Sequence, residues 1–285
     1  MSTSSTGNVF ITGAAAGIGA AATRLLAEAG YTVFAGVHKD TGSLDRLPGV
    51  RQVPLDVTDP DSVAAAAASV ASVAGERGLR ALINNAGIIV QGPIELVRQQ
   101  DLERQFAVNT LGPAYAIQSF APLLRAGRGR VINVSAPTAR VHVPFLSALV
   151  GSKAALEAMS DAIRLELDVW GISVVVIEPG LTDTRIFAKA DAVAQAGLAV
   201  TDAGLIELYQ ARLAAVATTS AAQRPGSPES VAKAILAAVT ARTPKRRYVA
   251  GRDARMAGVI TALPAGVRDR LLRGFLGLSQ SAAPR

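Results

Sequence analysis

The stretch NVFITGAAAGIG, residues 8–19, decides the fold. Residues 8–11 are mostly apolar or β-branched and predict a strand, and an Ala- and Leu-rich stretch predicts a helix over 17–29. Between them lie three glycines, Gly13, Gly17 and Gly19. Glycines at such a turn let the backbone approach a pyrophosphate, and the helix N-terminus offers that anion free N–H groups. The stretch therefore predicts a dinucleotide-binding site.

The same alternation of strand and helix continues along the chain. Apolar runs at 31–36, 51–55, 80–84, 130–134, 172–177 and 247–250 predict six further strands. Helices are predicted over 101–125 and over 147–170, and two more from Pro60, with Asp59 as N-cap, and from Pro228, with Ser227 as N-cap. Several strands are continuously apolar, which is typical of a parallel sheet that helices cover on both faces. We therefore expect an α/β fold, a single Rossmann-type doubly wound parallel domain of about seven strands over residues 1–285.

Two segments extend beyond this predicted sheet. Residues 181–226 follow the sixth strand, and an excursion at the carboxyl end of a strand is a natural substrate lid. This segment carries five apolar side chains that favour a hydrophobic substrate: Leu198, Leu205, Ile206, Leu208 and Leu213. Residues 252–285 are expected to form a basic C-terminal helical extension. Residues 240–285 hold ten Lys or Arg and two Asp, a net charge of +8, whereas the rest of the chain carries −1.

The basic extension includes apolar side chains that fall near one face of a helix: Val267, Leu271, Leu272, Phe275 and Leu278. Arg268, Arg270 and Arg273 lie near them in the sequence. We expect this helix to pack on the domain or on a partner subunit, in preference to a membrane surface. Nucleic acid is not an expected partner, because no aromatic stacking platform accompanies the charges.

The composition excludes several classes of site. The 285 residues include no Cys and two His, His38 and His142. This excludes disulfides, a thiolate nucleophile and a His-rich metal cluster, so no metal site is expected. The sequence carries no signal-like stretch, and its uncharged runs are shorter than the ~20 residues of a membrane-spanning helix. We expect a cytoplasmic protein.

Three motifs together resemble a known family. They are Gly13-x-x-x-Gly17-x-Gly19, Asn84-Asn85-Ala86-Gly87 after the fourth strand, and Pro179-Gly180 after the sixth. Across essentially the whole chain this combination resembles the short-chain dehydrogenase/reductases, and the C-terminal part resembles the branch with retinol and hydroxysteroid dehydrogenases. The resemblance implies these cofactor-binding residues: Gly13, Ala16, Gly17, Ile18, Gly19, His38, Lys39, Asp56, Val57, Asn85, Ala86, Gly87, Lys153, Pro179, Gly180, Thr182 and Thr184.

The end of the second strand indicates which dinucleotide is bound. A carboxylate at this place binds the ribose 2′-hydroxyl and favours NAD. By the resemblance, that position is Val37, which has no carboxylate. His38 and Lys39 follow as basic side chains for a 2′-phosphate, although Asp40 comes next. We therefore expect NADP in preference to NAD.

The resemblance implies four catalytic side chains, of which the sequence has two. Asn109, in FAVNTLG, and Lys153, in GSKAAL, match the Asn and the Lys of the family. The Tyr position, four residues before the Lys, holds Leu149, and the Ser position, thirteen residues earlier, holds Ala136. Neither side chain can transfer a proton to a substrate. Ser135 is a poor substitute for Ala136, because adjacent side chains on a strand point in opposite directions.

Three hypotheses follow for the function. The first, which we favour, is an oxidoreductase that acts on a hydrophobic alcohol or carbonyl by an atypical proton route, from His142, Ser147, Tyr209 or a water near Lys153. The second is a non-redox reaction on a hydrophobic metabolite, such as a cyclisation, an aldol-type step or an isomerisation. The third is a catalytically dead NADP-binding sensor or scaffold. The resemblance also implies a homodimer or homotetramer that pairs through the helices predicted over 101–125 and 147–170.

Overall fold

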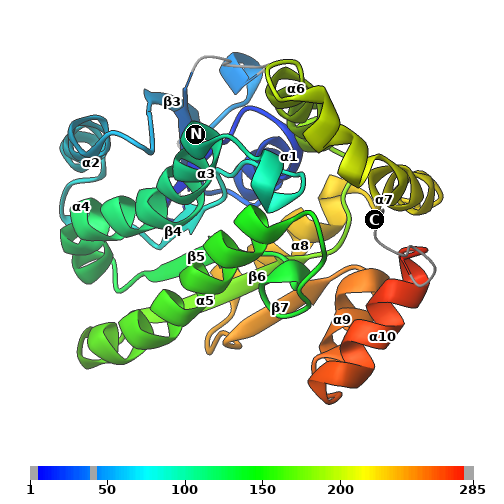
Figure 1. The fold of residues 1–285 in the computed structure, drawn as a ribbon. Helices are drawn as coiled ribbons and strands as arrows, with labels where there is room; N and C mark the ends of the chain where they lie inside the picture. The colour runs from blue at the N-terminus through cyan, green and yellow to red at the C-terminus, as the bar shows by residue number, and fades with distance from the viewer. Residues whose placement is uncertain (1–5, 39–43, 279–285) are drawn as a thin grey trace.

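Each strand of the sheet runs parallel to its neighbours, as the continuous apolar runs predict (Figure 1). The computed structural model describes residues 6–38 and 44–278. In it seven strands lie in the order β3-β2-β1-β4-β5-β6-β7. Their bounds are β1 (Asn8–Thr12), β2 (Thr32–Val37), β3 (Val50–Pro54), β4 (Ala81–Asn84), β5 (Arg130–Val134), β6 (Ser173–Pro179) and β7 (Arg247–Ala250). The strand order reverses between β1 and β4, which is where doubly wound sheets bind their ligands.

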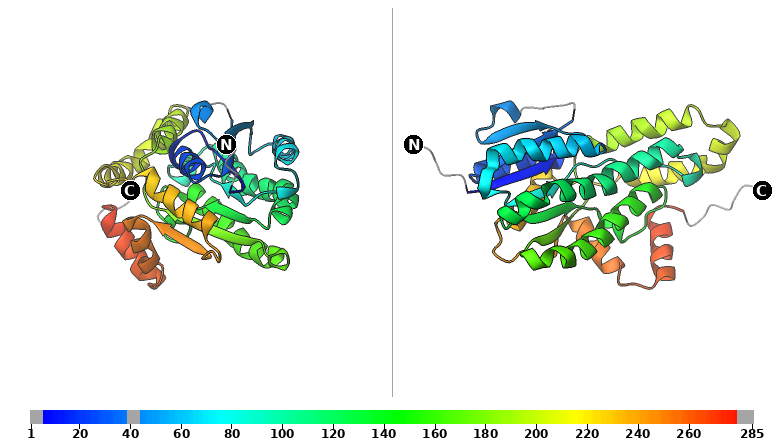
Figure 2. Two further views of the ribbon diagram at one scale, coloured as in Figure 1. Left: turned by 180° about the vertical axis from the view of Figure 1, so that it is seen from behind. Right: turned by 90° about the vertical axis from the view of Figure 1, so that its left-hand side faces the viewer.

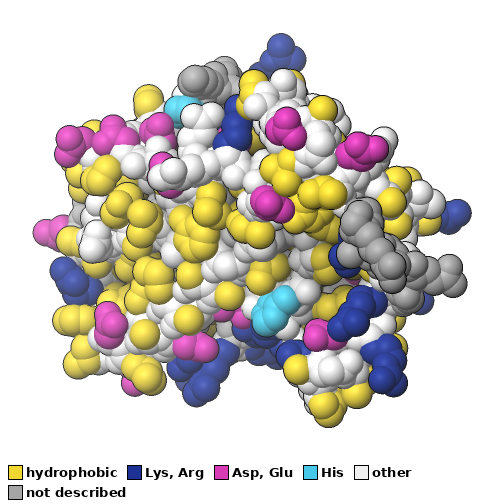
Figure 3. Space-filling view, in the orientation of Figure 1, with side chains coloured by type: hydrophobic (Ala, Val, Ile, Leu, Met, Phe, Trp, Pro, Cys, Tyr) yellow, Lys and Arg dark blue, Asp and Glu magenta, His cyan; other side chains and the backbone are white. Residues whose placement is uncertain are grey.

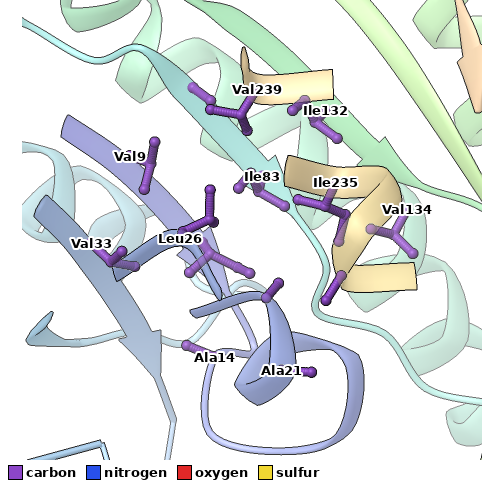
Figure 4. Packing of buried hydrophobic residues seen from close by; sticks show 14 of the residues in the cluster. Val9, Ala14, Ala21, Leu26, Val33, Ile83, Ile132, Val134, Ile235 and Val239 are labelled. Carbon is purple, nitrogen blue, oxygen red and sulfur yellow. The ribbon is translucent and has the colours of Figure 1, made fainter. Parts of the chain in front are cut away.

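Helices cover both faces of the sheet, and the predicted doubly wound fold is confirmed. Helices α1 (Gly17–Glu28) and α8 (Pro228–Thr240) pack on one face, where their side chains meet those of the central strands (Figure 4). Helices α2 (Pro60–Ala74), α4 (Gly112–Ala126) and α5 (Ser147–Leu167) lie on the other face. Along β1, Val9 and Ile11 point to the first face and Phe10 to the second, so each strand supplies both layers of the core.

Two of the predicted helix starts are confirmed by their capping hydrogen bonds. The side chain of Asp59 accepts from the N–H of Asp61 at 3.0 Å and begins α2. The side chain of Ser227 accepts from the N–H of Glu229 at 3.1 Å and begins α8. In both helices Pro occupies the first position, where its missing N–H costs nothing.

The prediction of one continuous helix over 101–125 is wrong. The chain instead forms α3 (Gln99–Phe106), a π-helical turn (Ala107–Leu111) and then α4. Pro113 supplies the physical reason, because it has no N–H to donate to the carbonyl of Asn109 and cannot continue α-helical hydrogen bonding. The helix predicted over 147–170 likewise ends at Leu167, and a 3₁₀ turn (Asp168–Trp170) follows it.

The segment after β6 contains two helices, α6 (Ile186–Leu198) and α7 (Ala203–Ala221), which project from the sheet domain (Figure 2, right). Helices α9 (Arg252–Ile260) and α10 (Ala265–Phe275) follow β7 and lie side by side. Both pairs therefore leave from the carboxyl ends of neighbouring strands. Within residues 6–38 and 44–278, no helix is long and apolar enough to cross a membrane.

Candidate active site

The hydroxyl of Thr12 joins the loops that leave β1 and β4. Its Oγ1 accepts hydrogen bonds from the backbone N–H of Asn85 at 3.0 Å and of Ala86 at 2.9 Å. The side-chain amide of Asn85 donates in return to the carbonyls of Thr12, at 3.0 Å, and of Gly13, at 3.2 Å. The predicted cofactor residues of the two motifs are therefore held in direct contact across the switch point of the sheet.

The glycine-rich loop is packed so closely that side chains would not fit. A Cβ on Gly13 would stand 2.9 Å from the Cα of Ala86, and Gly13 has a φ of +65°. A Cβ on Gly19 would overlap the carbonyl of Gly13. The N-cap of α1, Ala16, has no side-chain oxygen, so the N–H groups of its first turn receive no cap from it. A loop of Gly and Ala alone before an uncapped helix N-terminus fits a bound pyrophosphate.

Gly17 brings the third motif against this loop. A Cβ on Gly17 would stand 2.8 Å from the methyl carbon of Thr184, and Gly17 has a φ of +52°. The hydroxyl of Thr184 accepts from the N–H of Ile186 at 3.4 Å at the start of α6, and that of Thr182 donates to the carbonyl of Gly180 at 2.7 Å. The segment after β6 therefore lies over the glycine-rich loop, as the assignment of Thr184 to the cofactor requires.

A histidine and a carboxylate lie close together where the chain leaves β2 and β3. Val37 is buried at the end of β2, and the exposed His38 places its Nε2 3.3 Å from Oδ2 of Asp56. Hydrogen bonds from Thr58 lower the pKa of the Asp56 carboxyl, so this group carries a full negative charge near neutral pH. Lys39 and Asp40 lie outside the described residues, and Val57 packs against Gly112 of α4.

Asp253, in the first turn of α9, holds the Pro179-Gly180 loop and was missed in the sequence. Its Oδ2 accepts from the N–H of Leu181 at 2.5 Å. A Cβ on Gly180 would overlap this carboxylate, and one on Gly251, at a φ of +119°, would stand 2.8 Å from it. The signal for this contact in the sequence was the pair of glycines, Gly180 and Gly251. They lie far apart along the chain, so the sequence does not show that they meet.

Asn109 and Lys153 meet beside Gly87. The position of a Cβ on Gly87 is 3.4 Å from Oδ1 of Asn109 and 3.7 Å from Nζ of Lys153. The amide of Asn109 exchanges two hydrogen bonds with the backbone of Ile88, at 2.9 and 3.0 Å, and the π-helical turn positions it to do so. The structure thus brings these two predicted residues to the same place at the carboxyl end of β4.

Lys153 is a buried cation with one hydrogen bond of its own. Its Nζ donates to the carbonyl of Val134 at 2.7 Å. Burial lowers the pKa of Lys153 to about 8, and the nearby Glu157 opposes this shift without cancelling it. Glu157 is engaged elsewhere, because both of its oxygens bind Arg247, at 2.6 and 3.0 Å. The amine therefore changes its charge within reach of physiological pH.

Leu149 and Ala136, which stand where the family has Tyr and Ser, both precede this lysine in the sequence. Leu149 is buried on α5, one helical turn before Lys153, and its carbonyl accepts from Ser152 at 3.0 Å. Ala136 follows the end of β5 in extended conformation. The hydroxyl of Ser135 donates to Oε1 of Glu157 at 2.7 Å and is buried. Ser135 is therefore committed to α5, which agrees with the alternation along the strand.

The other candidate proton donors lie in more exposed places. His142 is exposed in the loop between β5 and α5, and Ser147 is exposed at the first turn of α5. The hydroxyl of Tyr209 on α7 donates to Oε2 of Glu95 at 2.6 Å, and this hydrogen bond raises the pKa of Tyr209. Tyr209 thus fastens α7 to the loop after β4, and Gln91 binds Asp191 of α6 at 2.5 Å in the same way. In the described part of the chain, no three His, Asp or Glu are placed to hold a metal ion.

A buried polar network supports α5. Gln105 donates to Ser152 at 3.1 Å and to the carbonyl of Ile88 at 3.0 Å, and Thr110 donates to the carbonyl of Ser152 at 2.9 Å. These contacts join residues that lie 17 to 47 positions apart. They were missed in the sequence, because a Gln or Thr in a helix gives no signal of its partner.

Residues 7–195 match the family model of the short chain dehydrogenases. The chain belongs to the short-chain dehydrogenase family. This family uses NAD or NADP, and the fold just described is its Rossmann-like fold.

Individual relatives extend this likeness. Over 283 residues the chain is 33% identical to retinol dehydrogenase 5 of Mus musculus, covering 94% of this chain and 88% of that one. It is 34% identical to 3-amino-tetrahydro-pyrrolizinone reductase of Xenorhabdus hominickii, but spans only 64% of that protein's length. A crystal structure of a short chain dehydrogenase from Burkholderia cenocepacia in complex with NADP has a TM-score of 0.74 and 25% identity. That match covers 97% of this chain and 99% of the other.

The glycine-rich loop can be tested with two alanine variants that have the same backbone strain. Gly17→Ala and Gly171→Ala each place a side chain at a left-handed φ, +52° and +67°, at a cost of about 1 kcal/mol. The two variants differ in what the new Cβ meets. At position 17 it stands 2.8 Å from Thr184, whereas at position 171 no described atom lies within 4 Å of it. We expect Gly17→Ala to weaken NADPH binding by about tenfold or more, and Gly171→Ala to leave it unchanged. Calorimetric titration measures both; equal losses would contradict the role of this loop.

Proposed function

We propose that this short-chain dehydrogenase is an NADP(H)-dependent oxidoreductase that acts on a hydrophobic alcohol or carbonyl. The observation that carries this proposal is the meeting of Asn109 and Lys153 beside Gly87. Both are buried, and both stand next to the loops that fit a dinucleotide. The part of the family's catalytic group that serves the cofactor is thus present, although the hydroxyls that serve the substrate are replaced by Ala136 and Leu149.

The residues that would hold the cofactor follow from the packing. The uncapped first turn of α1 and the loop from Gly13 to Gly19 would receive the pyrophosphate, and Lys153, with Asn109 near it, would hold the nicotinamide ribose. When bound, this cofactor supplies a hydride to the substrate carbon or accepts one from it. Val37, which adds no carboxylate at the end of β2, and the basic His38 after it support NADP over NAD.

We assign the proton to Lys153, acting through water. Leu149 and Ala136 carry no polar atom that could donate one. The ammonium of Lys153 has three N–H groups and donates one of them to the carbonyl of Val134. The other two can donate to a water or to the substrate. Its lowered pKa, about 8, lies near the value at which a group serves as acid and as base at neutral pH. His142 and Tyr209 are weaker candidates, since one lies in an exposed loop and the other is bonded to Glu95.

The lid favours a hydrophobic substrate. In α7 every residue is at least partly exposed, so its apolar side chains are not buried in the core of the domain. Leu205, Ile206 and Leu213 are half-buried and Leu208 is exposed. The likeness to a retinol dehydrogenase agrees with this choice.

Cofactor choice is tested by thermal shift. NADPH is expected to raise the melting temperature more than NADH at equal concentration, because the ligand that binds the native state more tightly stabilises it more. Val37→Asp places a carboxylate where it repels a 2′-phosphate, so we expect this variant to prefer NADH. Val37 is itself buried, so the melting temperature of the variant without ligand must show that it still folds; Val73→Asp, at an exposed position of α2, controls for the added charge alone. Equal shifts with both dinucleotides in the natural protein would contradict the choice of NADP.

The redox assignment is tested by restoring the missing hydroxyls. Ala136→Ser with Leu149→Tyr completes the set around Lys153 and Asn109, and should raise NADPH oxidation with hydrophobic ketones by ~10²-fold or more. Each single change should give little, because these groups act as a unit.

The outcome of that experiment separates the function classes. If neither protein oxidises NADPH while both bind it tightly, the oxidoreductase proposal is wrong. The apolar pair Ala136 and Leu149 then favours a non-redox enzyme or a dinucleotide-binding sensor.

The proton route predicts a pH dependence. Carbonyl reduction consumes a proton, so the ammonium form of Lys153 is needed and the rate should fall as the pH rises through about 8. The reverse reaction should gain rate over the same interval. Lys153→Met should remove the dependence, whereas Tyr209→Phe and His142→Ala should retain it. A pH limb that disappears in either of the last two variants would identify that residue as the donor instead.

A further inference from the structure

Helices α9 and α10 present an apolar stripe to solvent. Met256 and Val259 on α9 are 66% and 70% exposed, and Leu271 and Phe275 on α10 are 50% and 62% exposed. In α10 every described residue is at least partly exposed. Of the two predicted alternatives, packing on the domain is wrong for Val267, Leu271 and Phe275, and of the predicted set Leu278 is fully buried. Packing on a partner subunit stays a prediction.

Within each helix the exposed apolar residues lie on one face. Val267, Leu271 and Phe275 are spaced by four residues and so form one stripe along α10, and Met256 and Val259 are spaced by three on α9. At 100° per residue, Arg268 and Arg270 stand on either side of the α10 stripe. Figure 3 shows basic side chains around this corner of the molecule, with apolar atoms at its outer tip.

From this arrangement we propose that the α9–α10 face docks on an anionic phospholipid membrane. Helices that lie in a membrane interface combine an apolar stripe with flanking Lys or Arg, because the apolar side chains enter the acyl region while the cations contact the headgroups. The charge is complementary, since residues 252–278, which contain α9 and α10, hold five Arg and two Asp, a net charge of +3. A second copy of the chain would bring the same arginines together, which disfavours it as the occupant.

The docking face is connected to the candidate active site. After α10 the chain turns back, so that Leu276 and Leu278 are buried and a Cβ on Gly277 would stand 3.7 Å from Ala215 of α7. In the first turn of α9, the carboxylate of Asp253 accepts the hydrogen bond that holds the loop after β6. Helix α10 and the helices of the 181–226 segment lie at the same end of the molecule (Figure 2, right). Docking would also bring the entrance for the substrate to the lipid, and this part of the proposal rests on the proposed function. The docking itself does not rest on it.

The proposal is tested by flotation with vesicles of phosphatidylcholine alone and of phosphatidylcholine with phosphatidylserine. The natural protein should float with the anionic vesicles at low ionic strength, and less as added salt screens the charges. Leu271→Glu with Phe275→Glu removes the stripe, and Arg268→Glu with Arg270→Glu removes its flanking charge. Each pair should lower the bound fraction by about tenfold or more. Val73→Glu, which places the same charge on an exposed apolar position of α2, should change nothing.

Three results would overturn the proposal. In the first, the natural protein fails to bind anionic vesicles. In the second, both double variants bind as well as the natural protein, which places the contact elsewhere. In the third, sedimentation velocity shows that the natural protein is a dimer and that the Leu271→Glu, Phe275→Glu variant is not, which makes a second copy the occupant. The thermal shift with NADPH should be retained in every variant, and a loss of it would show misfolding. Failure of the redox proposal would leave vesicle binding intact, so the two failures are distinguishable.

Discussion

The contact between the ends of β1 and β4 is the constraint on which the site depends. Two parallel strands that end side by side leave backbone groups without partners at their carboxyl ends, and buried backbone groups must be satisfied. Thr12 and Asn85 do this by side-chain hydrogen bonds in both directions. With the loops so close, only glycine fits at positions 13 and 19. The dinucleotide cradle is therefore a consequence of how two strands are tied together, and the N-terminus of α1 is exposed to ligand by the same packing.

Ion pairs between buried carboxylates and half-buried arginines extend this framework to β6 and β7. Arg247 of β7 binds Glu157 of α5 and, at 2.9 Å, Glu178 of β6, which also accepts from Arg140 at 2.5 Å. Ion pairs buried in this way add little net stability, since their desolvation offsets their attraction, but removing one partner is costly. Their effect here is positional. They fix the catalytic helix against the strands and keep the carboxylate of Glu157 from fully stabilising the ammonium of Lys153.

The parts of the fold that depend on local signals were predictable from the sequence. Strand periodicity, the caps at Asp59 and Ser227 and the glycines of the first turn each act within a few residues, and the structure agrees with them. The interruption of the helix around Asn109 was not predicted, although Pro113 is a local signal for it; the hydrogen bond from Ile88 to Asn109 joins residues 21 positions apart and has no local signal. The role of Asp253 escaped for the same reason, since its partner Leu181 is 72 residues away. The exposure of α10 depends on which side the core already covers, and periodicity gives a helix face but not its direction.

The pair of apolar residues at positions 136 and 149 has its own physical logic. A single hydroxyl left in a dry site without its partner costs about 1–3 kcal/mol, whereas replacing both partners by apolar groups is nearly neutral. Ala136 and Leu149 together therefore make a stable site, in which neither position leaves an unpaired hydroxyl. Lys153 is different, because its partners do not offset the cost of removing its charge from water. It donates one hydrogen bond, to Val134, and the nearby carboxylate of Glu157 is bound to Arg247. An aliphatic side chain at 153 would pack at lower cost. The buried ammonium is best accounted for by a ligand that supplies hydroxyl oxygens at this place, as the ribose of a dinucleotide does, and this argument holds whether or not the reaction is redox.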